Sequence, residues 1–262
     1  MRDYCLSMKI ASWNVNSLNV RLPHVTEWLA AHEPHTLVLQ EIKQTTEAFP
    51  AEAFAELGYH AVASGQKTYN GVAVISRSPI DEVETELPGF ADEQRRVLAA
   101  SVDGVRVIDL YVPNGQSLDS EKYQYKLSWL AALKDFLGEQ LARYPNLVVL
   151  GDFNIAPEDR DVYDAEKWGE DVLCSPPERA ALQALLDLGL ADTFRQFEQA
   201  EKSFSWWDYR AAGFRRNAGL RIDLILASAA MQQACRASYI DPEPRAWERP
   251  SDHAPVVAEF AI

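Results

Sequence analysis

The sequence has few cysteines and no long apolar run, and both absences exclude classes of protein. Its three cysteines, Cys5, Cys174 and Cys235, form no CxxC pair and no zinc pattern, which argues against a disulfide scaffold and fits a reducing cytosol. No stretch of 18 or more apolar residues exists, so no membrane span is predicted. Met1 to Met8 is too short and too mixed in polarity for a signal peptide. We therefore expect a cytoplasmic protein.

Positive charge is also scarce. The chain carries 25 Lys and Arg against 39 Asp and Glu, a formal net charge of -14. A protein that coats nucleic acid by bulk electrostatics needs a basic face, and this balance argues against one. It still permits an enzyme that touches a few phosphates through a local basic rim and a metal ion, since acidic clusters hold divalent cations.

Several catalytic motifs are missing as well. There is no G-x-S-x-G elbow for a serine nucleophile and no glycine-rich P-loop. His32-Glu33-Pro34-His35 is one residue short of H-E-x-x-H, and Pro34 would break the helix that a zincin needs. Serine hydrolase, P-loop NTPase and zincin chemistry are therefore excluded.

What the chain does contain is a series of apolar strand-like runs with a few helical patterns between them. Strands outnumber helices, and short turns join several neighbouring strands, which favours mixed sheets with helices outside rather than simple βαβ winding. We expect one domain over residues 1-262, a flexible tail at 1-8 and a functional loop at 155-178. The predicted strands are 9-13, 36-40, 59-64, 71-76, 97-102, 105-112, 147-150, 204-207, 223-227 and 254-260, and the predicted helices are 21-32, 120-142 and 177-188.

Polar side chains follow many of these strands where they end. The apolar run Leu147-Leu150 leads to Asp152 and Asn154, which point the same way because side chains alternate along a strand. One such pair fits a turn or a helix cap, but the repetition is hard to attribute to turns alone. We expect these residues to converge on one rim of packed sheets. The other members are Asn14, Asn16, Gln40, Glu41, Tyr111, Asn114, Asp223, Asp252 and His253.

Ligands rich in oxygen and poor in histidine suit a hard ion such as Mg²⁺ rather than zinc. Mg²⁺ usually binds one or two carboxylates together with water and a substrate phosphate. The pattern therefore points to metal-assisted cleavage of a phosphoester.

The chain resembles the exonuclease III family of DNA-repair apurinic/apyrimidinic endonucleases and 3′-exonucleases, within the endonuclease/exonuclease/phosphatase superfamily. The resemblance spans residues 8-262, and the motifs stand in the family's order. They are Trp13-Asn14-Val15-Asn16-Ser17-Leu18, Leu39-Gln40-Glu41-Ile42-Lys43, Tyr69-Asn70-Gly71-Val72-Ala73, Gly151-Asp152-Phe153-Asn154-Ile155-Ala156-Pro157, Gly219-Leu220-Arg221-Ile222-Asp223 and Ser251-Asp252-His253-Ala254-Pro255.

This resemblance implies a DNase I-like fold, a four-layer α/β sandwich of two mixed β-sheets packed face to face with helices outside. It also implies roles for the residues at the strand ends. Glu41, Asn14 and Asp252 would lie at a Mg²⁺ ion, for which Mn²⁺ could substitute. Asp152 would orient and deprotonate the attacking water, Asn154, Tyr111 and Asn114 would contact the phosphate, and His253, oriented by Asp223, would stabilise its charge. The general base, Asp152 or His253, stays open at this stage.

The resemblance further implies a substrate. Trp206, Leu220 and Ile222 would form an apolar pocket that admits a base-free deoxyribose. The partner would be double-stranded DNA with abasic sites or 3′ ends, bound by a monomer associated with the nucleoid, and Gly169 would leave room for the duplex. Basic residues that could contact phosphates, or could equally be solvated surface charges, are Arg95, Arg96, Lys122, Lys126, Arg215, Arg216 and Arg221.

Two other functions remain open. A superfamily relative that acts on phospholipid, inositol phosphate or RNA would share the metal site and fit the acidic composition. A binding module with a decayed site is the second, although every expected catalytic position holds a competent residue.

Overall fold

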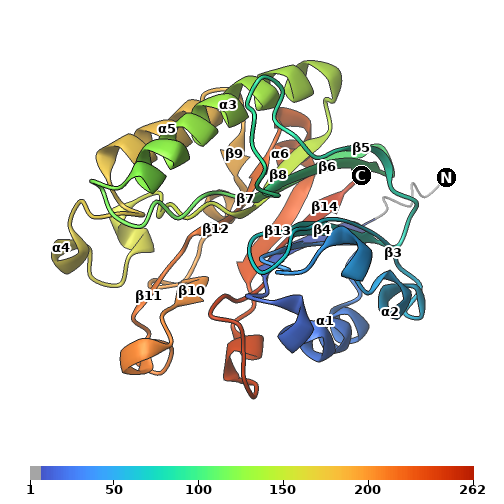
Figure 1. Cartoon of the computed structure of the whole chain (residues 1–262), viewed down its shortest axis with the longest axis horizontal. Coiled ribbons are helices and arrows are strands. Elements are labelled where there is room, and N and C mark those ends of the chain that lie inside the picture. The colour runs from blue at the N-terminus through green and yellow to red at the C-terminus, as the bar shows by residue number, and fades with distance from the viewer. Residues whose placement is uncertain (1–6) are drawn as a thin grey trace.

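The computed structural model describes residues 7–262 and contains two six-stranded sheets that pack face to face. Helices cover the outer face of each sheet, as Figure 1 shows. The layers therefore run helix, sheet, sheet, helix, and the predicted four-layer sandwich is confirmed. No helix of the described residues is long and apolar enough to cross a membrane.

The first sheet has the strand order β13-β14-β1-β2-β4-β3. Its β1 and β2 are parallel, and its other neighbours are antiparallel. These strands are β1 (Ser7–Asn14), β2 (Thr36–Gln40), β3 (His60–Ser64), β4 (Val72–Ser76), β13 (Cys235–Ile240) and β14 (Val256–Ala261).

The second sheet has the order β5-β6-β7-β8-β12-β9, with β7 and β8 parallel. A separate two-stranded ribbon pairs β10 with β11. These strands are β5 (Asp81–Glu84), β6 (Val97–Val102), β7 (Val105–Tyr111), β8 (Leu147–Asp152), β9 (Ala191–Asp192), β10 (Trp206–Trp207), β11 (Gly219–Leu220) and β12 (Asp223–Ala227).

The longest helix, α3 (Glu121–Arg143), is capped at its N-terminus by Ser120, whose side chain accepts a hydrogen bond from the backbone N–H of Tyr123. It lies beside α5 (Pro176–Leu186) over the second sheet, whereas α1 (Leu18–His32) and α2 (Ala51–Ala55) lie against the first (Figure 1). The remaining helices are α4 (Ala165–Trp168), α6 (Ala229–Ala234) and short 3₁₀ turns at Thr46–Ala48, Asp159–Asp161, Thr193–Gln196, Arg210–Ala212 and Glu243–Ala246.

Three apolar layers hold the sheets and helices together. One lies between the two sheets and includes Val38, Val107 and Val148. The other two fill the space between each sheet and its helices, around Trp129 and Trp28 respectively. Because both faces of the central strands are buried, these strands read as continuous apolar runs, and β2, β6 and β12 have the predicted bounds.

The strands that sequence reasoning missed are short or lie at sheet edges. The edge strand β5 is largely exposed and polar, so it shows no apolar run. In the edge strand β13, Arg236 and Ser238 interrupt the apolar residues, and β9 and β11 have two residues each. The predicted tail at residues 1-8 is wrong for Ser7 and Met8, which pair with Ala261 and Phe260 as the start of β1. Residues 1–6 lie outside the described part of the chain.

A polar bridge crosses the otherwise apolar layer between the sheets. The Gln40 side chain on β2 donates from Nε2 to Asp109 Oδ1 on β7 at 2.7 Å and to Ser12 Oγ at 3.0 Å. Asp109 Oδ2 accepts from the backbone N–H of Ala73 at 3.2 Å. Burial raises the pKa of Asp109 well above its usual range, although these hydrogen bonds oppose the rise.

We expect Asp109→Ala to lower the free energy of unfolding by about 2–4 kcal/mol, because it leaves two buried donors without their acceptor. Asp109→Asn keeps the shape of the side chain and one of its two acceptor oxygens, and should cost less. Because the folded-state pKa of Asp109 is raised, its contribution to stability is fully present below pH ~4 and is lost as pH rises through the folded pKa. The free energy of unfolding of Asp109→Asn, measured in urea, should therefore rise relative to that of the wild type between pH 5 and pH 8. If both variants lost the same unfolding free energy at pH 5 and at pH 8, the proposed role of the Asp109 hydrogen bonds would be wrong.

Candidate active site

The polar ends of strands from both sheets meet at one cavity of about 170 Å³. The sequence-predicted residues come from β1, β2, β7, β8 and β12 and from the segment before β14, at the end of the sandwich that also carries the β10–β11 ribbon (Figure 1). Ten residues line the cavity: Glu41, Tyr111, Asn114, Asp152, Asn154, Leu173, Trp206, Ile222, Asp252 and His253. Seven of the polar residues expected to converge line this cavity, whereas the side chain of Gln40 lies between the sheets and bonds Asp109.

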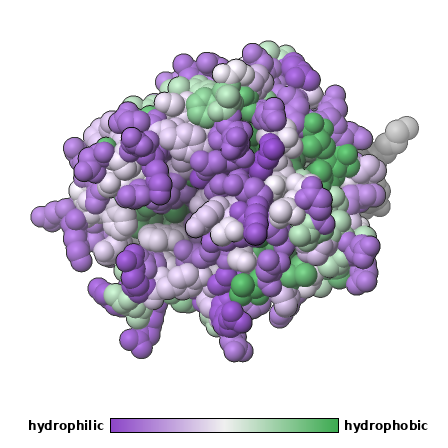
Figure 2. Space-filling view, in the orientation of Figure 1, coloured by the Kyte–Doolittle hydropathy of each residue, from purple (hydrophilic) through white to green (hydrophobic). Residues whose placement is uncertain are grey.

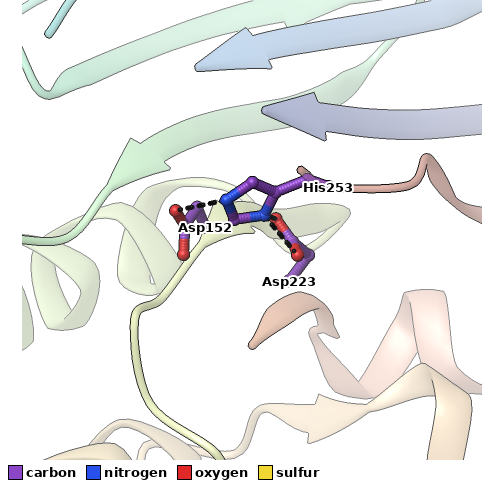
Figure 3. A group of neighbouring side chains, drawn as sticks. All are labelled: Asp152, Asp223 and His253. Atoms are coloured by element: carbon purple, nitrogen blue, oxygen red, sulfur yellow. Dashed lines mark hydrogen bonds and ion pairs between the residues drawn. The ribbon is translucent and has the colours of Figure 1, made fainter. Parts of the chain in front are cut away.

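Two buried carboxylates lie directly opposite one another at the centre of the site. Antiparallel pairing of β8 with β12 sets Asp152 against Asp223, and both are at most 2% exposed. The imidazole of His253 lies between them, as Figure 3 shows. Its Nδ1 is 2.9 Å from Asp223 Oδ2 and its Nε2 is 3.7 Å from Asp152 Oδ2. Ser205 Oγ also donates to Asp223 Oδ2, at 2.6 Å.

This arrangement determines which of the groups carry charge. Burial alone would lower the pKa of His253, but Asp223 and then Asp152 outweigh it and raise the pKa to about 10. Burial also raises the pKa of Asp152 to about 7, with His253 acting in the opposite direction. At neutral pH the imidazole is therefore a cation with both ring nitrogens engaged, and Asp152 can take up a proton.

A chain of hydrogen bonds links Asp152 to Asn154 and Asn154 to Asn114. The backbone N–H of Asn154 donates to Asp152 Oδ1 at 2.9 Å, and the side-chain Nδ2 of Asn154 donates to the carbonyl of Val112 at 2.9 Å. Asn114 Nδ2 in turn donates to Asn154 Oδ1 at 3.1 Å. The glycine before Asp152 is required by packing, because a Cβ on Gly151 (φ +145°) would lie 2.0 Å from the carbonyl oxygen of Leu110 on β7.

Glu41 and Asp252 form the acidic side of the cavity. Asn14 Nδ2 donates to Glu41 Oε1 at 3.0 Å and to Asp152 Oδ2 at 2.9 Å, which joins the two sheets. Lys43 Nζ is 2.9 Å from Glu41 Oε2. Glu41 has φ +53°, a left-handed conformation that costs a non-glycine residue about 1–2 kcal/mol. Strain of this kind tends to persist where the surrounding structure needs a particular side-chain position.

The charges that line the cavity suit a divalent cation. Three carboxyl groups, Glu41, Asp152 and Asp252, line the cavity with one imidazolium, His253, so acidic groups outnumber the cation. All the available donors on the acidic side are oxygens, which Mg²⁺ prefers. Ligand atoms of Asp152, Asp223 and His253 also lie within 4.8 Å of one another, but a metal there would have to displace the imidazolium proton. Glu41 and Asp252, which line the cavity, are therefore the residues that could hold a metal, and Asn14 positions Glu41 through its Nδ2.

Tyr111 keeps its phenol proton at this site. Burial, followed by the charges of Glu41 and Asp152, raises the pKa of Tyr111 well above its usual range. The guanidinium of Arg96 opposes this rise and lies 4.7 Å from the centre of the Tyr111 ring. The phenol is therefore a neutral hydrogen-bond donor close to two carboxylates.

One wall of the cavity is apolar. Trp206 and Ile222 line it together with Leu173, and Trp206 Nε1 donates to Asp252 Oδ2 at 3.0 Å. Leu220, predicted to share this wall, is fully buried behind it and pairs with Trp206 in the β10–β11 ribbon.

The structure corrects several predicted DNA contacts. Arg221 is 1% exposed, and its guanidinium lies 2.6 Å from Asp161 and 2.7 Å from Asp192, so it cannot reach DNA. Arg96 is buried against Tyr111, and its Nη1 donates to the Tyr111 carbonyl. Lys126 is also fully buried. The exposed or partly exposed candidates are Arg95, Lys122, Arg215 and Arg216.

The structural roles of Lys126 and Leu173 could not be predicted from the sequence. Lys126 on α3 forms a buried ion pair with Glu178 and donates to the carbonyls of Asn114 and Asn154, which fixes both amide loops from behind. Glu178 also accepts from the backbone N–H of Leu173, the lining residue with φ +76°. The sequence suggested Lys126 only as a possible phosphate contact, because no local pattern reveals its buried partner Glu178. Leu173 is a single apolar residue in a loop and did not stand out.

Known proteins share this fold and chain length. The exodeoxyribonuclease III of Haemophilus influenzae is 37% identical over 266 residues, which cover 97% of this chain and all of that protein. A 3′ phosphatase from Neisseria bound to a product DNA hairpin has a TM-score of 0.95 at 55% identity, covering 97% of this chain and 99% of that one. An AP endonuclease from Archaeoglobus fulgidus has a TM-score of 0.93 at 39% identity, covering 97% and 100%. Residues 11–253 match the Endonuclease/Exonuclease/phosphatase family, and the chain belongs to that family.

Proposed function

We propose that this protein is a Mg²⁺-dependent DNA-repair phosphodiesterase that cleaves DNA 5′ to abasic sites and removes residues from 3′ ends. The observation that carries this proposal is the cavity itself, in which a proton acceptor, an imidazolium, two amides and an acidic metal-binding side surround a small apolar wall. The names of the relatives agree with this proposal, since they are an exodeoxyribonuclease, a 3′ phosphatase with a DNA product and an AP endonuclease.

In this mechanism Asp152 is the general base. Hydrolysis of a phosphodiester needs a water aligned with the phosphorus and a group that takes its proton. Asp152 has a raised pKa and lies within the cavity, so it can orient the water and accept that proton. His253 is unsuited to this role because its pKa is about 10 and both of its nitrogens face carboxylates.

The remaining polar groups stabilise charge on the phosphate. The His253 imidazolium supplies a positive charge, and the Tyr111 phenol and the Asn114 and Asn154 amides donate hydrogen bonds without adding negative charge. Glu41, Asp252 and Asn14 would hold Mg²⁺, or Mn²⁺ in its place, which neutralises negative charge on the phosphate when it is bound.

The apolar wall selects the sugar. Trp206 and Ile222 leave a small cavity next to the phosphate groups, with Leu220 supporting Trp206 from behind. A deoxyribose without a base can turn out of the duplex into such a space, whereas an attached base would be excluded by its bulk. Gly169, at the end of α4, has open space around its Cβ position, in keeping with a loop that leaves room for duplex DNA.

The working form would be a cytoplasmic monomer associated with the nucleoid. The rival substrates, phospholipid, inositol phosphate and RNA, lack support from the relatives named above, all of which carry DNA-directed names or a bound DNA product.

With Mg²⁺ present, we expect the protein to cut a duplex that contains one abasic site, on its 5′ side, and to stop when the metal is chelated. Asp152→Asn should lower turnover by roughly 10²–10⁴-fold, since general base catalysis contributes that much. Asp135→Asn, an exposed position on α3, is the matched control and should change nothing. Product analysis on denaturing gels measures both effects. Intact substrate at high enzyme concentration, or faster turnover on a lipid, inositol phosphate or RNA substrate, would refute the proposal.

Glu41→Gln should weaken Mg²⁺ binding by roughly ten-fold or more, because it removes one full negative charge from an oxygen-ligand site. Titration calorimetry with Mg²⁺ on the free protein measures this directly, without relying on turnover. The control is Glu47→Gln, an exposed neighbour in the 3₁₀ turn Thr46–Ala48, which should bind as the wild type does. Unchanged binding by Glu41→Gln would place the metal elsewhere.

A further inference from the structure

A second cavity adjoins the active-site cavity and shares one wall with it. Its volume is about 220 Å³, and Trp206 lines both cavities. It lies between the segment that contains α4 and the segment that follows β10. Figure 2 shows the mostly hydrophilic surface of this face, with a hollow to the left of its centre, near α4 and the β10–β11 ribbon of Figure 1.

The side chains around this second cavity are aromatic and basic. Tyr163, Trp168 and Trp206 supply partly exposed rings, and Lys167, Arg210 and Arg216 supply three positive charges against the single carboxylate of Asp208. Such a group of cations is notable in a chain with a net charge of -14. Aromatic faces with cations beside them are the features that bind unpaired nucleotides, by stacking on the base and by attracting the backbone.

The ring of Trp168 is held in a defined orientation. Its Nε1 donates to the carbonyl of Val172 at 3.1 Å, and the ring meets that of Tyr163 edge to face, with ring centres 6.5 Å apart. The aromatic wall is therefore prepared before a ligand binds, which lowers the ordering cost of binding.

The proposed activities create a need for such a site. The active-site cavity of about 170 Å³ must take the phosphate, the attacking water and a sugar, and under the proposed function its apolar wall excludes a base. An abasic residue meets this limit. A 3′-terminal nucleotide removed by exonuclease action still carries its base, which must leave the helix and find another place.

We propose that the second cavity binds the base of the 3′-terminal nucleotide while the phosphate on its 5′ side is cleaved. This inference rests on the proposed function and divides its two activities between two sites. Removal of a normal nucleotide uses both cavities, whereas cleavage at a base-free sugar uses the first alone. Trp206, on the shared wall, would contact the sugar on one side and the base on the other.

The test compares two DNA hairpins that differ only in the 3′-terminal residue, which is either thymidine or a tetrahydrofuran abasic analogue. Single-turnover rates of removal of that residue are measured with excess protein and Mg²⁺. Trp168→Ala should slow thymidine removal about ten-fold or more, since base stacking on one aromatic side chain is worth about 1–3 kcal/mol. Removal of the abasic analogue should stay within two-fold of the wild type, and Trp168→Phe should restore most of the thymidine rate.

A second variant guards against local unfolding around α4. Arg216→Gln changes an exposed charge in the cavity wall and should slow thymidine removal selectively. Arg236→Gln, an exposed arginine on β13 outside this cavity, is its control and should leave both rates unchanged. Binding is followed separately with 2-aminopurine as the 3′-terminal base and the metal chelated. The wild type should quench its fluorescence, and Trp168→Ala should quench it much less.

Equal slowing of both hairpins by Trp168→Ala, or no slowing of either, would overturn the second site. So would equal quenching of 2-aminopurine by the wild type and Trp168→Ala. If the wild type removes neither terminal residue, the proposed function itself fails, and the second site fails with it. If the wild type removes both terminal residues but the variants slow the two removals equally, the proposed function stands and only the second site is refuted.

Discussion

The pairing of Asp152 with Asp223 across two antiparallel strands is the constraint on which the site depends. Two carboxylates at directly opposed positions repel one another, and burial increases the cost of their charge. The imidazole of His253, which arrives on a segment of the other sheet, contacts both of them and offsets that cost as a cation. The backbone of His253 also pairs with that of Trp206, so the segment that carries the imidazole fixes the apolar wall as well. The face-to-face packing of the two sheets therefore also determines the geometry of the site.

The strain around the cavity follows from this arrangement. Glu41, Asn154 and Leu173 all adopt left-handed backbone conformations that L-residues usually avoid. Buried contacts behind them hold them there. Lys126 and Glu178 fix the loops of Asn154 and Leu173, and Asn14 ties Glu41 to Asp152. Contacts within the protein thus hold the oxygen atoms of the cavity in place, and preorganised groups of this kind are effective in stabilising charge.

Much of this could be predicted from the sequence, because central strands buried on both faces read as apolar runs whose polar ends are conspicuous. The ends of β2, β8 and β12 were found in this way, and their side chains do meet. Charged residues were harder to place. Arg221 looked like a surface arginine, but its partner Asp161 is 60 residues away in the chain, and no local pattern reveals such a pair. The edge strand β5 was missed for the opposite reason, since exposure lets it carry polar side chains.

The most direct test of the central claim is a double-mutant cycle on the free energy of unfolding with His253→Gln and Asp223→Asn. If the imidazolium offsets the repulsion of two buried carboxylates, His253→Gln alone should cost about 3–5 kcal/mol, because it leaves both without a cationic partner. In the Asp223→Asn background only one carboxylate remains, so the same change should cost at least about 1 kcal/mol less. Equal costs in both backgrounds would show that His253 does not hold the two carboxylates together, and would contradict the account.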